Sequence, residues 1–281
     1  MLLETPMRIS PKCVALGSRY FPVFWLDTSP PLLVEGGVSA VVPRVLEHLR
    51  NTGAEVPSLL ILLHEHNDHV LGAPGLSEAL NLKVAATHPA AEILKKEKVI
   101  TLYREADMFF TGVLEARGEG KRCPWETFPT LSPLEGEHLP PGIRILPTPG
   151  HSPGSCALFW EDQGILFVSD SMGYYSSTGK HFPLFFQNLE LYLKSLEAMA
   201  QTEPSTLVLG HLQFFTGSEV KRVFQRSREE ALRLAETVKK AGEDAQEMVF
   251  RAIRQDELVT FYPEETIWEC ARLLVKRSLE A

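Results

Sequence analysis

The sequence predicts an α/β fold, a sandwich of sheets covered by helices and followed by a helical tail. Three observations predict it. Short apolar runs alternate with Gly- and Pro-rich turns through residues 1–216, helical stretches lie between them, and residues 217–281 change to long amphipathic periodicity. The length of 281 residues and the 44% hydrophobic and 23% charged content are those of an ordinary globular chain. We expect a domain over 1–216 and a helical extension over 217–281.

In the first 110 residues, apolar runs bounded by turn residues predict strands, and apolar residues spaced at three and four predict helices. The predicted strands are Cys13–Leu16, Tyr20–Leu26, Leu32–Glu35, Ser58–Leu63 and Lys83–Thr87. The predicted helices are Ser39–Arg50, Pro74–Leu80 and Pro89 to about Lys98. The Ser58–Leu63 run is almost wholly apolar, which is typical of a strand buried on both faces.

The middle of the chain begins with Thr111–Gly142, whose Gly and Pro content predicts a long irregular connection. The strands predicted after it are Ile143–Leu146, Cys156–Trp160, Ile165–Ser169 and Thr206–Leu209. The predicted helices are Asn188–Ala200, Ser218–Lys240, Ala245–Gln255 and Glu264–Leu279. Thr216-x-x-Glu219 resembles a capping box, and Pro263 directly precedes the last helix.

Composition excludes several function classes. The net charge of −8 argues against nucleic acid as the main partner, because phosphate binding needs clustered basic residues. The cysteines form no CxxC pair, so we expect free thiols and a reducing compartment. No run of about 18 apolar residues predicts a membrane span, and the N-terminus has no signal-peptide pattern. We therefore expect a cytoplasmic protein that does not bind membranes.

Four potential metal ligands lie within six residues directly after the Ser58–Leu63 strand. His64-Glu65-His66-Asn67-Asp68-His69 has the form HxHxDH. Imidazole nitrogen and carboxylate oxygen are the ligand types that suit Zn, Fe or Mn. On an extended turn, His64 and His66 point the same way, while Asp68 and His69 can reach a second ion. The alternative is an exposed polar loop with chance histidines, and the density of ligands argues against it.

Three more candidate ligands follow predicted strands. His151 lies in the turn Thr148-Pro-Gly-His-Ser-Pro-Gly, Asp170 ends Val168-Ser-Asp, and His211 ends Leu209-Gly-His. Each alone is more typical of a turn or cap residue. Together with HxHxDH they indicate a metal site, because a sheet scaffold can bring strand ends together.

This combined pattern resembles the metallo-β-lactamase superfamily over about residues 12–215. The resemblance implies an αββα sandwich with two metal ions at one edge. It implies one ion bound by His64, His66 and His151, a second bound by Asp68, His69 and His211, and Asp170 as the bridging carboxylate. No ligand is missing, which disfavours a metal-free member. His66 stands where the oxygen-reducing diiron flavoproteins typically have glutamate, which argues against that redox role.

The implied chemistry is hydrolysis with two divalent transition-metal ions, Zn or else Fe or Mn, as cofactors. Two ions about 3.5–4 Å apart can share a hydroxide, since a metal lowers the pKa of bound water to about 7. That hydroxide attacks a carbonyl whose oxygen one ion polarises. Asp68 is the candidate catalytic residue that handles a proton as well as binding metal.

A closer resemblance to one branch covers nearly the whole chain. Its motifs are Pro22-Val-Phe, Leu33-Val-Glu-Gly-Gly-Val-Ser39, Pro183-Leu-Phe-Phe with Leu191-Tyr-Leu-Lys-Ser-Leu-Glu197, and Phe261-Tyr-Pro263. They are similar to the quinolone-signal response branch of 2-aminobenzoylacetyl-CoA thioesterases. The resemblance implies hydrolysis of an acyl-CoA-type thioester, tail helices that close over the active-site mouth, and a possible homodimer.

Two positions depart from that branch and indicate a different acyl group. Tyr174 replaces a glutamate and Cys270 replaces a serine, and both are expected to face the substrate pocket with Phe182. Ordinary core packing is the alternative for Phe182 and Cys270.

Two other hypotheses about the function stay open. One is a glyoxalase II-like hydroxyacyl-glutathione hydrolase or a lactonase. Lactonases of this fold often carry a tyrosine three residues after the bridging carboxylate, whereas Tyr174 and Tyr175 lie four and five beyond Asp170. The other is a regulatory protein with residual hydrolase activity. In each enzymatic case the expected partner is a small-molecule thioester or ester.

Overall fold

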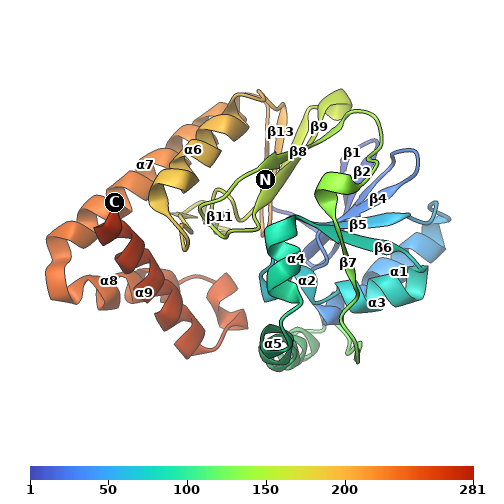
Figure 1. Cartoon of the computed structure of the whole chain (residues 1–281), viewed down its shortest axis with the longest axis horizontal. Helices are drawn as coiled ribbons and strands as arrows, with labels where there is room; N and C mark the ends of the chain where they lie inside the picture. The colour runs from blue at the N-terminus through green and yellow to red at the C-terminus, as the bar shows by residue number, and fades with distance from the viewer. The chain divides into compact units, whose positions relative to one another are not determined.

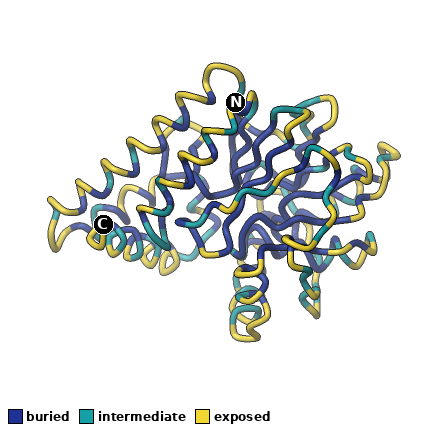
Figure 2. The backbone as a smooth tube through the Cα atoms, turned by 45° about the horizontal axis from the view of Figure 1, so that its top comes forward, coloured by how far each residue is buried: buried dark blue, intermediate teal, exposed yellow.

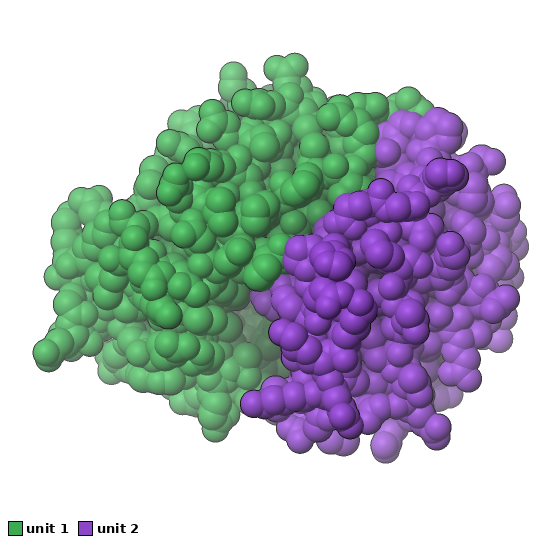
Figure 3. Space-filling model, in the orientation of Figure 1, with its two compact units in different colours: residues 1–2, 144–281 green, residues 3–143 purple.

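The computed structural model describes residues 1–281. The chain divides into two compact units, one formed by residues 3–143 and the other by residues 1–2 together with 144–281 (Figure 3). Each unit contains one large mixed β-sheet with its own helices (Figure 1). We call them the 3–143 unit and the 144–281 unit.

The sheet of the 3–143 unit contains seven strands that follow the order of the chain. They are β1 (Met7–Ser10), β2 (Cys13–Gly17), β3 (Pro22–Leu26), β4 (Leu32–Val34), β5 (Leu59–Leu62), β6 (Lys83–Ala86) and β7 (Leu131–Pro133). The first four pair antiparallel, and β4 to β7 pair parallel. All four residues of β5 are buried, as its apolar sequence predicts.

Five α-helices belong to this unit. They are α1 (Val42–Thr52), α2 (Asn67–Val70), α3 (Ala73–Leu80), α4 (His88–Leu94) and α5 (Glu97–Ala116), with short 3-10 turns at Ser39–Val41 and Leu134–Gly136. Helix α1 buries its Val42, Val45 and Leu49 face, the apolar stripe seen in the sequence. Its last turn ends at Gly53 in the left-handed conformation, a common helix stop.

The sheet of the 144–281 unit has the strand order β14-β13-β10-β9-β8. The strands are β8 (Ile143–Pro147), β9 (Cys156–Trp160), β10 (Ile165–Ser169), β13 (Thr206–Leu209) and β14 (Phe214–Thr216), while β11 (Tyr174–Tyr175) and β12 (His181–Phe182) form a separate ribbon. Every residue of β9 and β10 is buried, so these strands form the centre of this unit's core. Figure 2 shows the buried parts of the chain in dark blue. Strands β10 and β13 run parallel, so their carboxyl ends meet at one edge of the sheet.

Four α-helices complete this unit: α6 (Leu189–Ala200), α7 (Ser218–Ala241), α8 (Ala245–Arg254) and α9 (Glu264–Glu280), with 3-10 turns at Glu161–Gln163, Gly242–Asp244 and Leu258–Phe261. Asn188 caps α6, because its side chain accepts the Leu191 N–H. Helices α7 to α9 form the predicted helical extension after β14. None of the helices has the length and apolar character needed to cross a bilayer.

Three predicted features differ from the structure. The Thr111–Gly142 stretch is not wholly irregular, because α5 continues to Ala116 and β7 lies within it. The capping box at Thr216 is wrong: Gly217 is the N-cap of α7 and no side chain caps it. The histidine motif is not a simple extended turn, because Asp68 and His69 belong to the short helix α2.

Candidate metal centre

The seven predicted metal ligands fall into two groups, one in each unit. His64, His66, Asp68 and His69 lie in the 3–143 unit, and His151, Asp170 and His211 lie in the 144–281 unit. All except His66, which is half-buried, have buried side chains. Buried imidazoles and carboxylates need polar partners or a bound ion. The group that each nitrogen or oxygen atom faces therefore indicates the role of that side chain.

In the 3–143 unit the ligands follow β5, and Glu35 follows the neighbouring strand β4. Because β4 and β5 run parallel, with Val34 opposite Ile61, Glu35 and His64 emerge at the same edge of the sheet. The Glu35 N–H donates to the Ile61 carbonyl (2.9 Å) and the Gly36 N–H to the His69 carbonyl (2.8 Å). These bonds tie the end of β4 to the ligand motif.

The Glu35 side chain holds His69. Its Oε2 lies 3.2 Å from His69 Nδ1, and both side chains are almost wholly buried. A carboxylate at this nitrogen fixes Nδ1 as the protonated one and leaves Nε2 for a metal. The Glu35 backbone has φ of 66°, which is unusual for a residue other than Gly.

The other ligands of this group lie close to His69. The His64 ring centroid is 4.2 Å from that of His69 and 4.8 Å from that of His66. The nitrogen and oxygen ligand atoms of Glu35, His64 and His69 all lie within 4.8 Å of one another. Asp68 Oδ2 lies 3.4 Å from His69 Nε2, the nitrogen opposite the one that Glu35 holds. The structure therefore gathers this half of the predicted ligand set in one place.

Helix α5 supports this motif from the side. The Tyr103 hydroxyl donates to the Glu65 carbonyl between the first two histidines (2.9 Å). Burial raises the pKa of Tyr103, and the Glu65 and Asp68 carboxylates raise it further. The hydroxyl therefore stays protonated and keeps donating this hydrogen bond. The backbone of the motif is thus held by a residue that lies 38 positions away.

In the 144–281 unit, Asp170 lies between two histidines. Its Oδ1 is 3.4 Å from His211 Nε2, and its Oδ2 is 3.7 Å from His151 Nε2. Asp170 and His211 follow the parallel strands β10 and β13, whose ends the Gly210 N–H joins to the Ser169 carbonyl (3.1 Å). Each carboxylate oxygen thus faces one imidazole, which is the arrangement expected of a bridging carboxylate.

The turn that carries His151 is held by several contacts. His151 Nδ1 lies 2.7 Å from the Leu184 carbonyl, and the Gly150 N–H donates to Gln187 Oε1 (2.8 Å). Gly150 has φ of 126°, and a Cβ there would lie 2.3 Å from the Tyr192 backbone nitrogen. Only glycine fits this position, which explains the Pro-Gly-His sequence of the turn.

The donor set of each unit fits a cation. His151 Nδ1 faces a carbonyl oxygen, which accepts only, so this nitrogen carries the proton and Nε2 presents a lone pair toward Asp170. His69 likewise lies between Glu35 and Asp68, two groups that accept when ionised. A lone pair facing a carboxylate oxygen is repulsive unless a proton or a metal ion lies between them. Imidazole with carboxylate is the set that Zn, Fe and Mn accept.

The expected substrate-pocket residues Tyr174 and Phe182 lie beside this group. The Tyr174 and Phe182 rings stack at 4.9 Å with an interplanar angle of 13°, and Tyr174 meets the His211 ring edge-on at 6.5 Å. Burial, and then the charge of Asp256, raises the pKa of Tyr174 well above its usual value. Cys270, which is half-buried in α9, is a weaker cause of the raised pKa of Tyr174.

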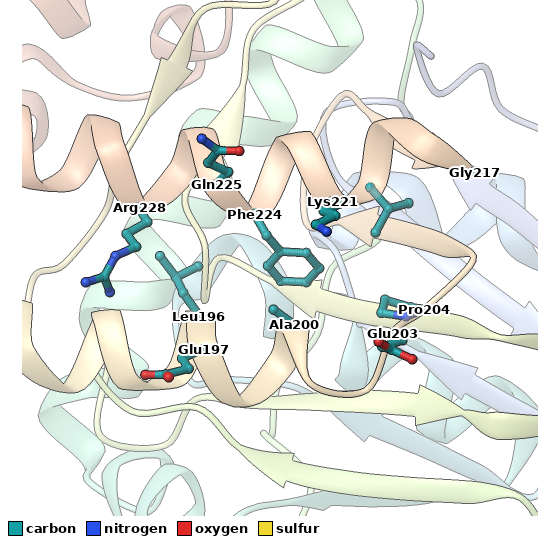
Figure 4. Close-up of a pocket in the computed structure, with 11 residues that line it drawn as sticks. Leu196, Glu197, Ala200, Glu203, Pro204, Gly217, Lys221, Phe224, Gln225 and Arg228 are labelled. Carbon is teal, nitrogen blue, oxygen red and sulfur yellow. The ribbon is translucent and has the colours of Figure 1, made fainter.

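A groove in the 144–281 unit lies away from these residues. It has a volume of about 580 Å³ and runs between α6 and α7, with Leu196 and Phe224 on its floor and Glu197 and Arg228 at its rim (Figure 4). None of the seven predicted ligands lines it. The groove is therefore not part of the candidate metal centre.

Sequence reasoning did not find the positioning roles of Glu35 and Tyr103. The signal for Glu35 was available in principle, since an acidic residue that directly follows an apolar strand and precedes two glycines needs a buried partner. Tyr103 gave no such signal, because its partner is a backbone carbonyl. His181, which is outside the predicted ligand set, has its Nε2 2.8 Å from the Met172 carbonyl oxygen.

All seven predicted ligands lie within the part of the chain that a known family model matches. A family model described as the Metallo-beta-lactamase superfamily matches residues 23–211. A hydroxyacylglutathione hydrolase from Chelativorans sp. (strain BNC1) is 27% identical over 143 residues, which are 49% of this chain and 44% of that protein. The chain therefore matches less than half the length of that relative.

Two solved structures show the same fold. A metallo-beta-lactamase superfamily protein from Sulfolobus tokodaii superposes with a TM-score of 0.62 at 15% identity, over 97% of this chain and 100% of that one. A metallo-beta-lactamase family protein from Thermus thermophilus gives 0.59 at 20% identity, over 97% and 92%. The predicted α/β fold with a C-terminal helical extension is confirmed. Because the family model spans more than half of the sequence, the chain belongs to the metallo-beta-lactamase superfamily.

Proposed function

We propose that this chain is a dinuclear metal-dependent hydrolase of acyl-CoA-type thioesters, and that its two ligand groups form one centre. The observation that carries the proposal is the Asp170 carboxylate, whose two oxygens each face the Nε2 of a histidine. In the proposed centre His64, His66 and His151 would hold one ion, Asp68, His69 and His211 would hold the other, and Asp170 would be a ligand shared by the two.

When bound, the two ions lower the pKa of a water molecule and polarise the substrate carbonyl. The chain's own residues orient the ligands for this work. Glu35 and the Leu184 carbonyl fix the Nδ1 atoms of His69 and His151, so that both Nε2 atoms face inward. Asp68 is proposed as the group that also accepts and returns a proton.

The choice of a thioester rests on leaving-group chemistry. The pKa of a thiol is about 8.5, so a thiolate can leave without being protonated by a strong general acid. The buried Tyr174, whose pKa is raised, is a poor source of a proton, and its stack on Phe182 gives an apolar wall beside His211. We propose that these rings and Cys270 contact the acyl group, and that the chain is related in activity to the quinolone-signal response thioesterases.

A second candidate is a glyoxalase II-like activity. The hydroxyacylglutathione hydrolase of Chelativorans supports it, and the reaction is also thioester hydrolysis. The two candidates differ in the carrier thiol, which is coenzyme A in one case and glutathione in the other. The same metal centre serves both.

The test begins with the purified full chain loaded separately with Zn, Fe and Mn. We expect two ions per chain and release of free thiol from a panel of acyl-CoA or acyl-glutathione thioesters, with lactones assayed in parallel. His69→Ala should abolish turnover, while the matched control His88→Ala, an exposed histidine outside both groups, should not.

Three outcomes would contradict the proposal. Failure to take up any transition metal under every loading condition would remove the metal centre. Opening of lactones alone would assign a different hydrolase class. Full metal occupancy without turnover of any substrate would favour a regulatory role.

A further inference from the structure

A second cavity lies in the 3–143 unit, beside the helix that supports the histidine motif. It has a volume of about 350 Å³ and is lined by α5 and by the segment that follows it, including Arg104, Asp107, Arg122 and Trp125. A cavity of this size matches the lower range of small-molecule sites in proteins. None of the seven predicted metal ligands lines it.

Trp125 is fixed in the wall of this cavity. Its Nε1–H donates to Asp107 Oδ2 (2.8 Å), and the other oxygen of Asp107 accepts the Ser39 N–H (3.1 Å). The Arg104 guanidinium lies over the indole, 5.0 Å from its centroid. Both oxygens of the buried carboxylate are therefore engaged by the protein, and the indole has a set orientation that suits stacking with a planar ring.

Positive charge is available at the same place. The Arg122 side chain lines the cavity and forms no hydrogen bond, ion pair or ring contact. The Glu115 carboxylate, the other acid in the wall, accepts the Arg122 backbone N–H (2.9 Å). Arginine guanidinium binds phosphate in a bidentate manner, so two of them beside an aromatic ring favour a phosphorylated planar ligand.

The cavity and the histidine motif share structural elements. Tyr103, which precedes Arg104 on α5, holds the Glu65 carbonyl within the motif. Ser39, which Asp107 holds, ends the Glu35–Ser39 segment whose first residue holds His69. A ligand in the cavity thus lies on the same framework as this half of the metal centre.

We propose that this cavity binds the phosphate-bearing nucleotide end of a carrier thiol of the coenzyme A type, a step that rests on the proposed thioesterase function. The base stacks at Trp125 and the phosphates pair with Arg104 and Arg122. Glutathione has neither a planar ring nor a phosphate, so occupancy of this cavity selects between the two carrier thiols. The acyl group does not enter it.

Binding is measured first on the full chain, by calorimetry and tryptophan fluorescence, with coenzyme A, adenosine 3′,5′-bisphosphate, pantetheine and glutathione as probes. Coenzyme A should bind at least tenfold more tightly than pantetheine and glutathione. Arg104→Gln and Arg122→Gln should each weaken coenzyme A binding about tenfold, the loss expected for one charge-assisted contact. The control Arg50→Gln, an exposed arginine of the same unit outside the cavity, should leave binding unchanged.

Kinetics then distinguishes a carrier site from a site for free nucleotide. One acyl group is compared on coenzyme A and on the truncated thiol N-acetylcysteamine. Arg122→Gln should raise KM for the coenzyme A thioester about tenfold, leave kcat unchanged, and leave the truncated thioester unaffected.

Other results overturn the inference without touching the proposed function. Equal binding of coenzyme A and pantetheine removes the nucleotide site. Tight binding of the bisphosphate with an unaltered KM for the coenzyme A thioester assigns the cavity to a free nucleotide. Conversely, if no thioester is hydrolysed, the proposed function fails, and coenzyme A binding still decides whether the cavity takes a nucleotide.

Discussion

Replacement of Glu35 tests the architecture of the metal centre, because its carboxylate lies against Nδ1 of the predicted ligand His69. Glu35→Ala removes the acceptor 3.2 Å from His69 Nδ1 at a site where both side chains are almost wholly buried. The N–H left behind has lost its partner, at a cost of about 1–3 kcal/mol in the free energy of unfolding. Glu35→Gln retains an oxygen that can accept the same N–H and should lose less.

Metal affinity should change in the same order. Loss of a carboxylate that orients a ligating histidine typically lowers metal affinity about 10- to 100-fold. We expect a tenfold or greater loss for Glu35→Ala and a smaller one for Glu35→Gln. The positive φ of residue 35 does not affect the comparison between glutamate and glutamine, because both residues bear the same backbone strain there.

The assay is a competition titration of the metal-free protein against a chelator, with urea unfolding of the same samples. Thr87→Ala is the control, because it removes another buried hydrogen-bonding side chain of the same unit, the N-cap of α4, that holds no predicted ligand. It should lower stability without changing metal affinity. Wild-type metal affinity in Glu35→Ala would refute the reasoning, as would an equal loss in the control.

Three further outcomes are expected. Asp170→Asn should bind fewer than two ions per chain by elemental analysis, because its two oxygens face two different histidines; retention of both ions would contradict this. Burial lowers the pKa of His181 to about 4, so its neutral form is favoured in the folded state. The free energy of unfolding should therefore be highest above pH 6.5 and fall by up to about 3 kcal/mol as the pH drops toward 4. His181→Asn should reduce this pH dependence, measured by urea unfolding across the same pH range. Gly150→Ala should lower the free energy of unfolding by about 3 kcal/mol or more, whereas Gly112→Ala, an exposed helix position with open space, should raise it by about 0.5–1 kcal/mol.

The strands and most helices were predictable because their signals are local. The apolar runs of β5, β9 and β10 and the stripe of α1 are visible in any short window of sequence. The end of helix α5 was assigned to an irregular connection because Thr111 and Gly112 disfavour helix, and the burial of Phe110 and Leu114 outweighs that preference. The capping box failed because Thr216 is the last residue of strand β14.

The sequence by itself determined the candidate ligands, since metal-binding side chains directly after apolar strands form a chemically unusual string. Only the tertiary structure decided what orients them. The parallel register of β4 and β5 brings Glu35 to His69 across 34 positions, and the fold places the Leu184 carbonyl at His151 Nδ1. Such pairs depend on strand register and on backbone carbonyls, which every residue possesses and no local pattern distinguishes.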